Sequence, residues 1–414
     1  MNILVLNCGS SSVRFQLIET DSDLMARDED RCLARGHLER FGDQALVSLQ
    51  AEGQPPIDRT GPISDHRAAI DLILRWIASD DSRIGGITSL ADIHAVGHRV
   101  VHGGERFQAS VRIDEKVMAG IEECAELAPL HNPVNLRGIR AAMELLGPDV
   151  PQVAVFDTAF HATMPETSFL YGLPLEIYQR HKIRRYGFHG TSHRYVAARY
   201  QTMRKLRLED VNVITLHLGN GCSVCAIKNG KSFDTSMGFT PLEGLVMGTR
   251  CGDIDPSVVE YLSFRAGMSL TEIDTLLNHK SGLLGLSGLS NDMRTLLEAE
   301  TVRHDSHARL AIDIFCQRAK KYIGAYFGEM GGADAVIFTG GIGENSPVIR
   351  ARICAGLERL GLTLDPVRNF EVLPGGGDVS TPGSTLKAFV IPTNEELMIA
   401  RDTLRAIESA STQS

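Results

Sequence analysis

Hydrophobic residues along this chain follow two different periods. Short apolar runs with the period and composition of strands occur at residues 3–19, where a polar turn interrupts the run, and at 93–101, 151–157 and 213–227. Helical spacing of apolar residues occurs at 66–79, at 128–147 and around Ile314, Phe315, Tyr322 and Tyr326. Strands that alternate with helices in this way are typical of an α/β fold.

The last part of the chain continues the alternation. Residues 333–360 are predicted to form a strand, a glycine-rich loop and a helix, and residues 391–407 a final helix. Thr393 and Glu396 have the spacing of a capping box, which would give Glu396 a structural role and leave Glu395 available for another. Asn132 or Asn135 is expected to cap the helix that follows residue 131.

The two halves of the chain carry a similar pattern. Sliding the sequence by about 211 residues places Ser12 and Val13 on Ser223 and Val224, again in a small-residue turn between apolar strands. Two halves with matching turns are what a two-lobed nucleotide-binding protein would have, and 414 residues exceed one ordinary core. We therefore expect an N-terminal lobe of residues 1–158, completed by a C-terminal helix at 395–414, and a C-terminal lobe of residues 159–394.

Composition excludes several classes of protein. The chain has 51 acidic and 42 basic residues, a formal charge of −9 and no long basic run, so a nucleic-acid partner is not expected. No stretch approaches the roughly 20 apolar residues of a membrane-spanning helix, and Met1 leads directly into a strand, so we expect a cytoplasmic protein without a membrane partner. The eight cysteines lack the spacing of a disulfide framework or zinc site and are expected to be reduced.

Three turns are candidates for binding phosphate. The first contains Asn7, Ser10 and Ser12, whose backbone N–H groups and hydroxyls can donate to an anion, although such a turn can equally be only a hairpin loop. The second is the Asn-Gly turn at 218–221. The third, at 339–343, precedes a helix, where glycine backbone can bind an anion or let adenosine approach.

The segment 237–256 is the most informative stretch of the sequence. It delivers Arg250 between Gly248 and Gly252, and small neighbours allow a guanidinium to reach a carboxylate or phosphoryl group. The alternative is a solvated ion pair with Asp253 or Asp255.

Three further residues have side chains suited to catalysis. Arg99 lies on an apolar strand before a glycine pair, so it needs either a carboxylate partner at the strand end or an anionic ligand. Asp157 follows a buried strand, the position at which open α/β sheets hold ligands. His189 lies between an aromatic residue and a glycine, and both a catalytic and a structural role stay open for it.

Ten segments, in one order from end to end, carry a resemblance to a known family. They are NCGSSS at 7–12, GHRVVHGGE at 97–105, PLHNP at 129–133, FDTAFH at 156–161, YGFHGTSH at 186–193, HLGNG at 217–221, MGFTPLEGLVMGTR at 237–250, GDIDP at 252–256, GGIGEN at 340–345 and PTNEE at 392–396. In these segments the chain closely resembles the acetate kinase (acetokinase) family of the actin-like and sugar-kinase superfamily.

The resemblance implies both a fold and a reaction. The fold would be α/β, with two ribonuclease-H-like lobes around a central nucleotide cleft and most of the nucleotide site in the C-terminal lobe. The reaction would be the reversible transfer of the γ-phosphoryl group of ATP to acetate by direct in-line displacement, giving ADP and acetyl phosphate. It would depend on Mg²⁺, with Mn²⁺ able to substitute, and the protein would be a homodimer.

The resemblance also assigns roles to individual residues. The expected catalytic residues are Arg99, Asp157, His189 and Arg250. The substrate carboxylate and methyl group are assigned to Arg99, Val101, Leu130, Phe188 and Pro241. The expected metal ligands are Asn7 and Glu395. The nucleotide is assigned to Ser10, Ser12, Arg14, His217, Leu218, Gly219, Asn220, Gly221, Asp292, Met293, Arg294, Gly341, Ile342, Gly343, Glu344 and Asn345.

Several alternatives stay open at this point. Arg14 stands where the family usually has lysine, so a bulkier fork replaces a compact ammonium, and its role at the nucleotide is left open. Asp157 either orients an arginine or a metal-bound water, or relays a proton. A propionate or butyrate kinase would use the same chemistry on a longer acid, and an actin-like nucleotide switch would need only the phosphate turns. A sugar kinase is disfavoured because two arginines suit an anionic acceptor better than a hydroxyl.

Overall fold

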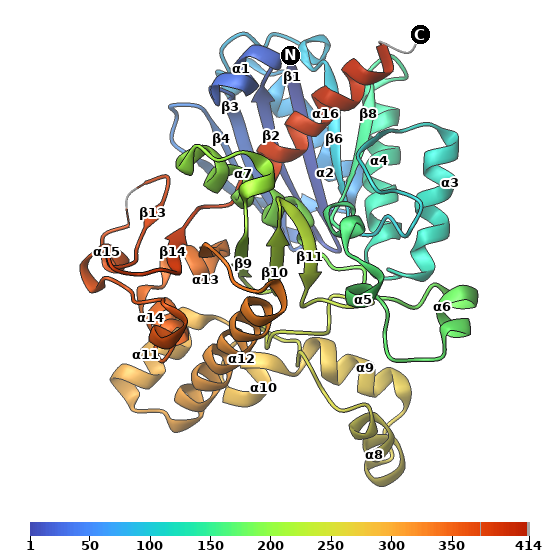
Figure 1. The fold of residues 1–414 in the computed structure, drawn as a ribbon. Helices are drawn as coiled ribbons and strands as arrows, with labels where there is room; N and C mark the ends of the chain where they lie inside the picture. The colour runs from blue at the N-terminus through green and yellow to red at the C-terminus, as the bar shows by residue number, and fades with distance from the viewer. Residues whose placement is uncertain (373, 412–414) are drawn as a thin grey trace. The chain divides into compact units, whose positions relative to one another are not determined.

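The computed structural model describes residues 1–372 and 374–411 of the chain (Figure 1). The chain forms two compact units: the first is Met1–Phe160 together with the segment that begins at Asn394, and the second is His161–Thr393. Each unit contains one β-sheet with helices packed against it, so the predicted α/β class is confirmed. Within the described residues, no helix has the length and apolar character needed to cross a membrane.

The first unit is built on an eight-stranded sheet in the order β5-β4-β3-β2-β1-β6-β8-β7. Its strands are β1 Asn2–Gly9, β2 Ser12–Glu19, β3 Arg31–Glu39, β4 Gly42–Ala51, β5 Ile57–Ile63, β6 Ala95–Val100, β7 Val111–Arg112 and β8 Gln152–Phe156. Its helices are α1 Ser22–Arg27, α2 His66–Ile77, α3 Glu115–Glu123, α4 Asn132–Leu146 and α16 Glu395–Ser411. β1, β6 and β8 are parallel neighbours, so their C-terminal ends meet at one edge of the sheet.

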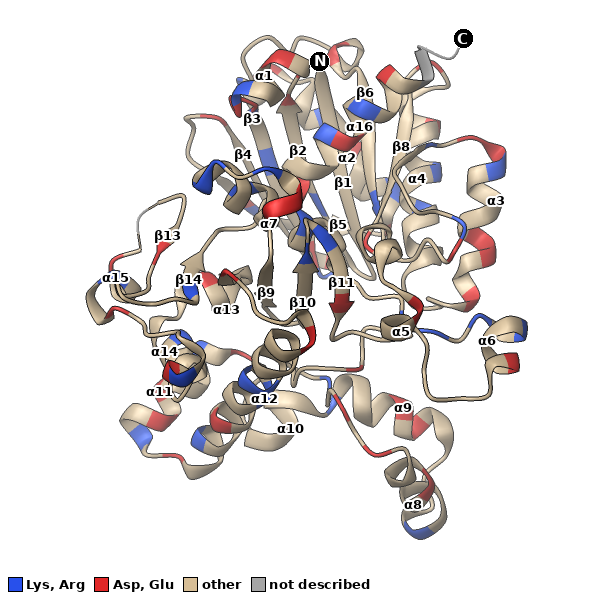
Figure 2. Cartoon of the chain, viewed as in Figure 1, with Lys and Arg blue, Asp and Glu red and all other residues tan. Residues whose placement is uncertain are grey.

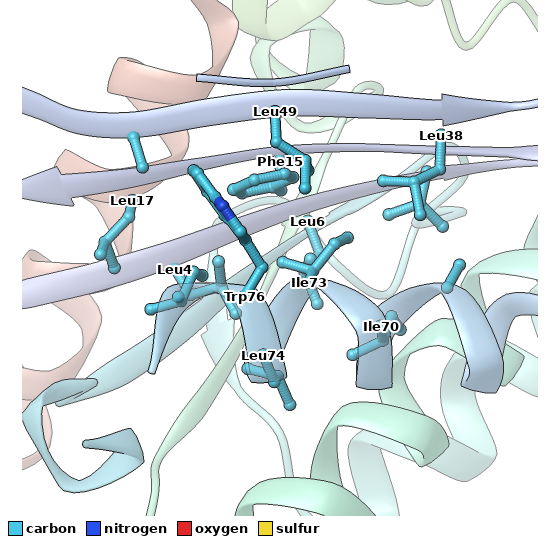
Figure 3. Packing of buried hydrophobic residues seen from close by; sticks show 14 of the residues in the cluster. Leu4, Leu6, Phe15, Leu17, Leu38, Leu49, Ile70, Ile73, Leu74 and Trp76 are labelled. Atoms are coloured by element: carbon cyan, nitrogen blue, oxygen red, sulfur yellow. The ribbon is translucent and has the colours of Figure 1, made fainter. Parts of the chain in front are cut away.

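Strand β1 is apolar on both faces because a helix covers each face. Leu4 and Leu6 point to the side of α2, where they join a cluster that includes Phe15, Ile73 and Trp76 (Figure 3). Alternate residues point the other way, and there Ile3 and Val5 pack against α16. Fully burying one such side chain stabilises the fold by about 1.5–3 kcal/mol. The continuous apolar run at the start of the sequence therefore reflects a strand buried on two sides.

The second unit is built on a six-stranded sheet in the order β11-β10-β9-β12-β14-β13. Its strands are β9 Val213–Leu218, β10 Cys222–Lys228, β11 Lys231–Thr235, β12 Ala335–Thr339, β13 Gly377–Asp378 and β14 Lys387–Val390. Its helices are α5 Glu166–Phe169, α6 Leu175–His181, α7 Gly190–Arg204, α8 Ser257–Ala266, α9 Leu270–His279, α10 Gly282–Ser287, α11 Met293–Arg303, α12 Ser306–Met330, α13 Gly340–Asn345, α14 Pro347–Cys354 and α15 Pro366–Phe370.

The two sheets repeat one arrangement of strands. In the first, β3, β2 and β1 are antiparallel neighbours and β6 and β8 continue the sheet in parallel. In the second, β11, β10 and β9 are antiparallel neighbours and β12 and β14 continue in parallel. The turns of β1–β2 and β9–β10 are therefore equivalent, as the alignment of Ser12 with Ser223 predicts.

Helix α12 is largely a core helix, as its apolar spacing predicts. Phe315 and Tyr326 are buried, whereas Ile314 and Tyr322 are only partly buried. Tyr322 has a polar role as well, since its hydroxyl donates to both carboxylate oxygens of Asp253 at 3.1 and 3.0 Å. The eight cysteines, all of which lie in the described residues, are free thiols.

The predicted helix caps at Asn132, Asn135 and Thr393 are wrong. Helix α4 begins at Asn132, and both asparagine side chains instead bind the backbone that follows β6. Helix α16 begins at Glu395, and the Asn394 side chain accepts a hydrogen bond from the Leu397 N–H at 3.0 Å. In each case a residue that fits a local capping pattern has its hydrogen bonds fixed by the tertiary structure.

Candidate active site

Charged residues of both signs are interspersed along the ribbon of each unit (Figure 2). Most of their ion pairs lie at the surface, such as Arg67 with Glu144, where water and salt screen the attraction. The pair of Arg99 with Asp157 is different, because the two side chains are only 22% and 2% exposed. Because a buried charge is costly and is often found at a functional site, the strand ends that carry this pair are a candidate site.

Arg99, Asp157 and Asn7 form one hydrogen-bonded group in the first unit. Arg99 Nε donates to Asp157 Oδ1 at 2.9 Å and Nη2 donates to Oδ2 at 2.6 Å, which makes the pair bidentate. Arg99 Nη1 donates to Asn7 Oδ1 at 3.2 Å. The three residues come from the ends of β1, β6 and β8, so the parallel register of these strands brings them together. The ion-pair alternative for Arg99 is thus correct, and its partner is another predicted site residue.

The charges of this group influence one another. Desolvation lowers the pKa of Arg99, but the charge and hydrogen bonds of Asp157 outweigh it, so the pKa is raised and Arg99 stays cationic. Desolvation raises the pKa of Glu395 to about 7, Arg99 opposes this shift, and Asp157 and Glu396 add to it. Glu395 therefore lies close to two other carboxylates, Asp157 and Glu396, and their combined negative charge would favour binding of an additional cation.

The β1–β2 turn carries Ser10, Ser12 and Arg14. A Cβ on Gly9 would lie 2.6 Å from Ser12 Oγ, so a larger residue at this position would require the Ser12 side chain to move. Ser10 is exposed, and Ser12 is partly buried. Arg14, opposite Asn7 in the β1–β2 register, is 64% exposed and pairs with Glu39 at 3.5 Å. A pair this exposed leaves the Arg14 guanidinium able to bind an anion instead.

The backbone after β6 is held by the two asparagines of α4. The Val101 N–H donates to Asn135 Oδ1 and the His102 N–H donates to Asn132 Oδ1, both at 3.1 Å. Val101 is buried in this setting, whereas Leu130 is 58% exposed. The sequence does not reveal these contacts of Asn132 and Asn135, because helix capping is the simpler local interpretation of both residues.

His189 and Arg250 come together around the β9–β10 turn of the second unit. A Cβ on Gly221 would lie 3.5 Å from both His189 Nε2 and Arg250 Nη1. His189 is the N-cap of α7 and has left-handed backbone angles, φ 56° and ψ 22°. Phe188, beside it, is buried, and its carbonyl accepts a hydrogen bond from His161 Nε2 at 2.9 Å. Arg250 Nη1 donates to the carbonyl oxygen of Pro241 at 3.2 Å.

The turn at 217–221 is braced by the segment that carries Arg250. The Gly248 N–H donates to the Asn220 carbonyl at 2.9 Å, and Asn291 Nδ2 donates to Asn220 Oδ1 at 3.1 Å. The Gly219 N–H donates to the Gly221 carbonyl at 3.1 Å. His217 and Leu218 end β9. The predicted phosphate turn and the predicted arginine are therefore parts of one local structure.

The acidic neighbours of Arg250 have contacts of their own in the surrounding loop. Asp253 Oδ1 accepts from the Gly244 N–H at 2.9 Å, and Asp253 also pairs with Arg318 at 3.3 Å. Asp255 accepts from the Ser257 N–H at the start of α8. Both carboxylates thus stabilise the loop that delivers Arg250.

The glycine loop at 339–345 is organised by two side chains. Glu344 Oε1 accepts from the Gly340 N–H at 2.8 Å and from the Thr393 N–H at 3.0 Å. The guanidinium of Arg350, which is buried, donates to the carbonyls of Gly343 and Glu344, each at 2.8 Å. Arg350 was not predicted from the sequence, where it has the appearance of an ordinary helical arginine. Gly341, Ile342 and Asn345 lie in the same short helix, α13.

Asp292, Met293 and Arg294 open helix α11. Asp292 is its N-cap and accepts from the Arg294 N–H at 2.8 Å, and Arg294 Nη2 donates to the same carboxylate at 2.7 Å. Met293 is buried, whereas Arg294 is 90% exposed on its side chain. Asp292 therefore has a capping role whether or not it contacts a nucleotide.

Comparisons with known proteins agree on one family. The model of the acetokinase family matches residues 2–401. The acetate kinase of Solibacter usitatus is 57% identical over 407 residues, which cover 98% of each chain. The crystal structure of Porphyromonas gingivalis acetate kinase superposes with a TM-score of 0.90 at 44% identity, covering 98% of this chain and 99% of that one. A propionate kinase structure from Francisella tularensis gives a TM-score of 0.89 at 42% identity, over 98% and 99% of the two chains.

Proposed function

Because this chain belongs to the acetokinase family, we propose the following account of its reaction. The chain is a kinase that acts on acetate, converting ATP and acetate to ADP and acetyl phosphate, and the observation that carries this conclusion is 57% identity to an acetate kinase over 98% of the chain. We infer that the transfer is reversible, direct and in line. Acetate is ionised at neutral pH, so the nucleophile already exists and no strong general base has to create it.

Electrostatic repulsion is the main obstacle to this reaction. A carboxylate must approach a polyanionic phosphate, and the loose transition state spreads negative charge over three equatorial oxygens. We propose that Arg99 and Arg250 neutralise the carboxylate and the phosphoryl group and that His189 donates to an equatorial oxygen. Asp157 orients Arg99, which its bidentate pairing supports, and a proton relay through Asp157 is not needed.

The function is tested by its dependence on a carboxylate. Protein incubated with ATP, Mg²⁺ and acetate is expected to form an acyl phosphate, measured as the hydroxamate, in proportion to the ADP released. ATP consumption that is indifferent to added acetate would instead favour an actin-like nucleotide switch.

Residues of the first unit fit a divalent cation. Asn7 offers an amide oxygen and Glu395 a carboxylate, which are the hard ligands that Mg²⁺ prefers while keeping several waters. Among the described residues no three His, Cys, Asp or Glu side chains gather to hold a metal by themselves, so nucleotide phosphates would complete the coordination. We propose Mg²⁺ at this position, with Mn²⁺ able to substitute. When bound, the ion would neutralise charge on the phosphates.

Glu395→Ala is expected to raise the Mg²⁺ concentration for half-maximal activity about tenfold or more, because one of few protein ligands is lost. The measurement is a Mg²⁺ titration of initial rate at saturating ATP and acetate. Glu408, an exposed carboxylate near the other end of the same helix that accepts a hydrogen bond from Ser22, is the control, and Glu408→Ala should leave the titration close to that of the wild type. An unchanged titration for Glu395→Ala would remove Glu395 from the metal site.

The acid pocket is assigned to Val101, Leu130, Phe188 and Pro241. Burial of Val101 and Phe188 supports contact with a methyl group, whereas the exposure of Leu130 leaves its contribution open to test. The propionate kinase among the similar structures makes a longer acid the second candidate substrate. Comparison of hydroxamate formation from acetate, propionate and butyrate decides between them.

Val101→Ala is expected to raise kcat/KM for propionate relative to acetate, because removing two methyl groups makes room for one methylene. The shift in ratio should lie between about 10-fold and 200-fold, the range that one methylene allows. Val100→Ala is the control, since Val100 packs in the core beside Phe107 and Ile121 instead. Equal substrate ratios in Val101→Ala and the wild type would place Val101 outside the pocket.

We propose that ATP contacts the turns at 10–14 and 217–221, the start of α11 at 292–294 and the loop at 341–345. The hydrogen bonds of Gly248 to Asn220 and of Gly340 to Glu344 support preformed loops at two of these places. We further propose that the protein is a cytoplasmic homodimer.

We propose that each chain has two domains. The first is residues 1–158 with 395–414, and the second is residues 159–394; the two compact units support this division.

A further inference from the structure

Four histidines gather in the second unit around the start of α7. The ring centroids of His189 and His217 are 4.3 Å apart, those of His161 and His193 are 5.9 Å apart, and those of His193 and His217 are 6.5 Å apart. His193 is wholly buried. Burial lowers the pKa of His193 well below its ordinary value, and His161 and His217 add to this effect. His193 is therefore neutral, with one ring nitrogen donating and the other accepting.

His193 is connected to His189 through a buried serine. Thr215 Oγ1 lies 2.7 Å from His193 Nδ1, and His193 Nε2 lies 2.8 Å from Ser223 Oγ. Ser223 Oγ in turn lies 2.9 Å from His189 Nδ1. Ser223 and Thr215 are both fully buried. These contacts form an unbroken hydrogen-bonded chain, which ends at the histidine that the proposed function places on the phosphoryl group.

The fold explains why these residues meet. His189 and His193 are four residues apart at the start of α7, so they share one face of the helix. In the antiparallel β9–β10 pair, Cys225 lies opposite Thr215 and Ser223 lies opposite His217, so Thr215 and Ser223 project from the same face of the sheet. The helix face and the sheet face that carry the four groups pack together.

The number of available protons restricts which groups donate and which accept along this hydrogen-bonded chain. When an anion lies at Nε2 of His189, that nitrogen has to carry the proton and Nδ1 of a neutral ring has to accept. The Ser223 hydroxyl then donates to His189 Nδ1, His193 Nε2–H donates to Ser223, and the Thr215 hydroxyl donates to His193 Nδ1. Every group in the chain is satisfied in this arrangement. Without the Ser223 hydroxyl, Nδ1 of His189 loses its donor and the opposite tautomer becomes competitive.

We propose that Ser223 and His193 are positioning residues, which hold the His189 ring and direct its Nε2–H toward the transferred phosphoryl group. This proposal rests on the proposed role of His189. The peptide before His189 is held as well, because His161 Nε2–H donates to the Phe188 carbonyl, an acceptor only. A left-handed histidine is an uncommon conformation that persists only where its surroundings fix it, and these contacts fix it from both sides.

Ser223→Ala is expected to lower kcat about 10-fold to 100-fold, because a buried acceptor loses its donor. KM for ATP and for acetate should stay within about threefold of wild type, since Ser223 is fully buried and has no proposed contact with either substrate. Ser223→Thr, which keeps the hydroxyl, should recover most of the rate. Ser380→Ala is the matched control, because Ser380 is equally buried and its hydroxyl donates to Asp378, which has no proposed role in the reaction; its kcat should equal that of the wild type.

Nitrogen-15 NMR of histidine-labelled wild-type protein, with Mg²⁺ and a non-hydrolysable ATP analogue, tests the arrangement without any substitution. We expect His189 and His193 to be neutral, with the proton on Nε2 in both, and Ser223→Ala to shift His189 toward the Nδ1–H tautomer. A wild-type His189 with its proton on Nδ1, or a Ser223→Ala variant with unchanged kcat and an unchanged His189 spectrum, would overturn the proposal.

The variant His189→Gln separates this proposal from the proposed function. If His189→Gln lowers kcat but Ser223→Ala does not, the proposed positioning role of Ser223 and His193 is wrong, and the catalytic role of His189 stands. If His189→Gln keeps the wild-type kcat, the role of His189 in the proposed function fails, and the inference that depends on it fails too. The nitrogen spectrum tells the two failures apart, because it reports the tautomer independently of turnover.

Discussion

Arg250→Ala is expected to lower kcat by about a thousandfold or more, with the largest loss in the chemical step. Arg250 is proposed to face the phosphoryl group, and its position is prepared in advance. Its Nη1 donates to the Pro241 carbonyl, and the surrounding loop is tied to Asp253 through the Gly244 N–H. Preorganised positive charge of this kind acts on the transition state without reorganisation. The measurement is steady-state acetyl phosphate formation at saturating ATP, Mg²⁺ and acetate.

The controls separate charge from geometry and from general damage. Arg250→Lys keeps the charge but loses the planar fork, so its kcat should lie between those of Arg250→Ala and wild type. Arg207→Ala removes an exposed arginine that pairs with Glu209 and Asp210 in the same unit, and it should retain wild-type kcat. Activity of Arg250→Ala within a few-fold of wild type would remove Arg250 from the mechanism.

Arg99→Ala is expected to reduce both activity and stability. The kcat should fall by about a thousandfold or more, for the same electrostatic reason. In addition, Asp157 would be left 2% exposed without its bidentate partner, and breaking such a pair costs about 3 kcal/mol of unfolding free energy. Urea unfolding followed by circular dichroism measures the second effect.

The stability effect of Arg99→Ala has a specific control. In an Asp157→Asn background no carboxylate is left uncompensated, so the same arginine substitution should cost clearly less unfolding free energy. Arg106→Ala, which breaks an exposed pair with Glu123, should change stability by about 1 kcal/mol or less. Equal costs for Arg99→Ala in the two backgrounds would contradict the assignment of the loss to Asp157.

Local patterns were sufficient to predict much of the fold. The apolar runs of β1, β9 and β12, the glycine turns between strands and the apolar spacing of α12 are properties of contiguous sequence, and each appears in the structure. The match of Ser12 with Ser223 also anticipated the repeated strand order of the two sheets. The α/β class could be predicted because strand and helix periods are local.

Interactions that depend on tertiary register could not be predicted in the same way. Asn132 and Asn135 resemble caps in the sequence, but the backbone after β6 offers their side chains N–H groups. Arg350 resembles an ordinary surface charge, yet together with Glu344 it holds the loop after β12. Ser223 was recognised only as part of a turn, because its contacts with His189 and His193 arise when a helix packs on a distant hairpin.

In the proposed mechanism, cationic side chains lower the barrier to transfer between two anions, instead of merely binding the substrates. The decisive experiment is a rapid-quench measurement of acetyl phosphate formation in a single turnover of Arg99→Ala and Arg250→Ala, with both substrates saturating. We expect the rate of the transfer step to fall by about a thousandfold or more in each variant while the Kd values for ATP and acetate change by less than about tenfold. A transfer step that keeps the wild-type rate in either variant, with the loss confined to substrate affinity, would contradict it.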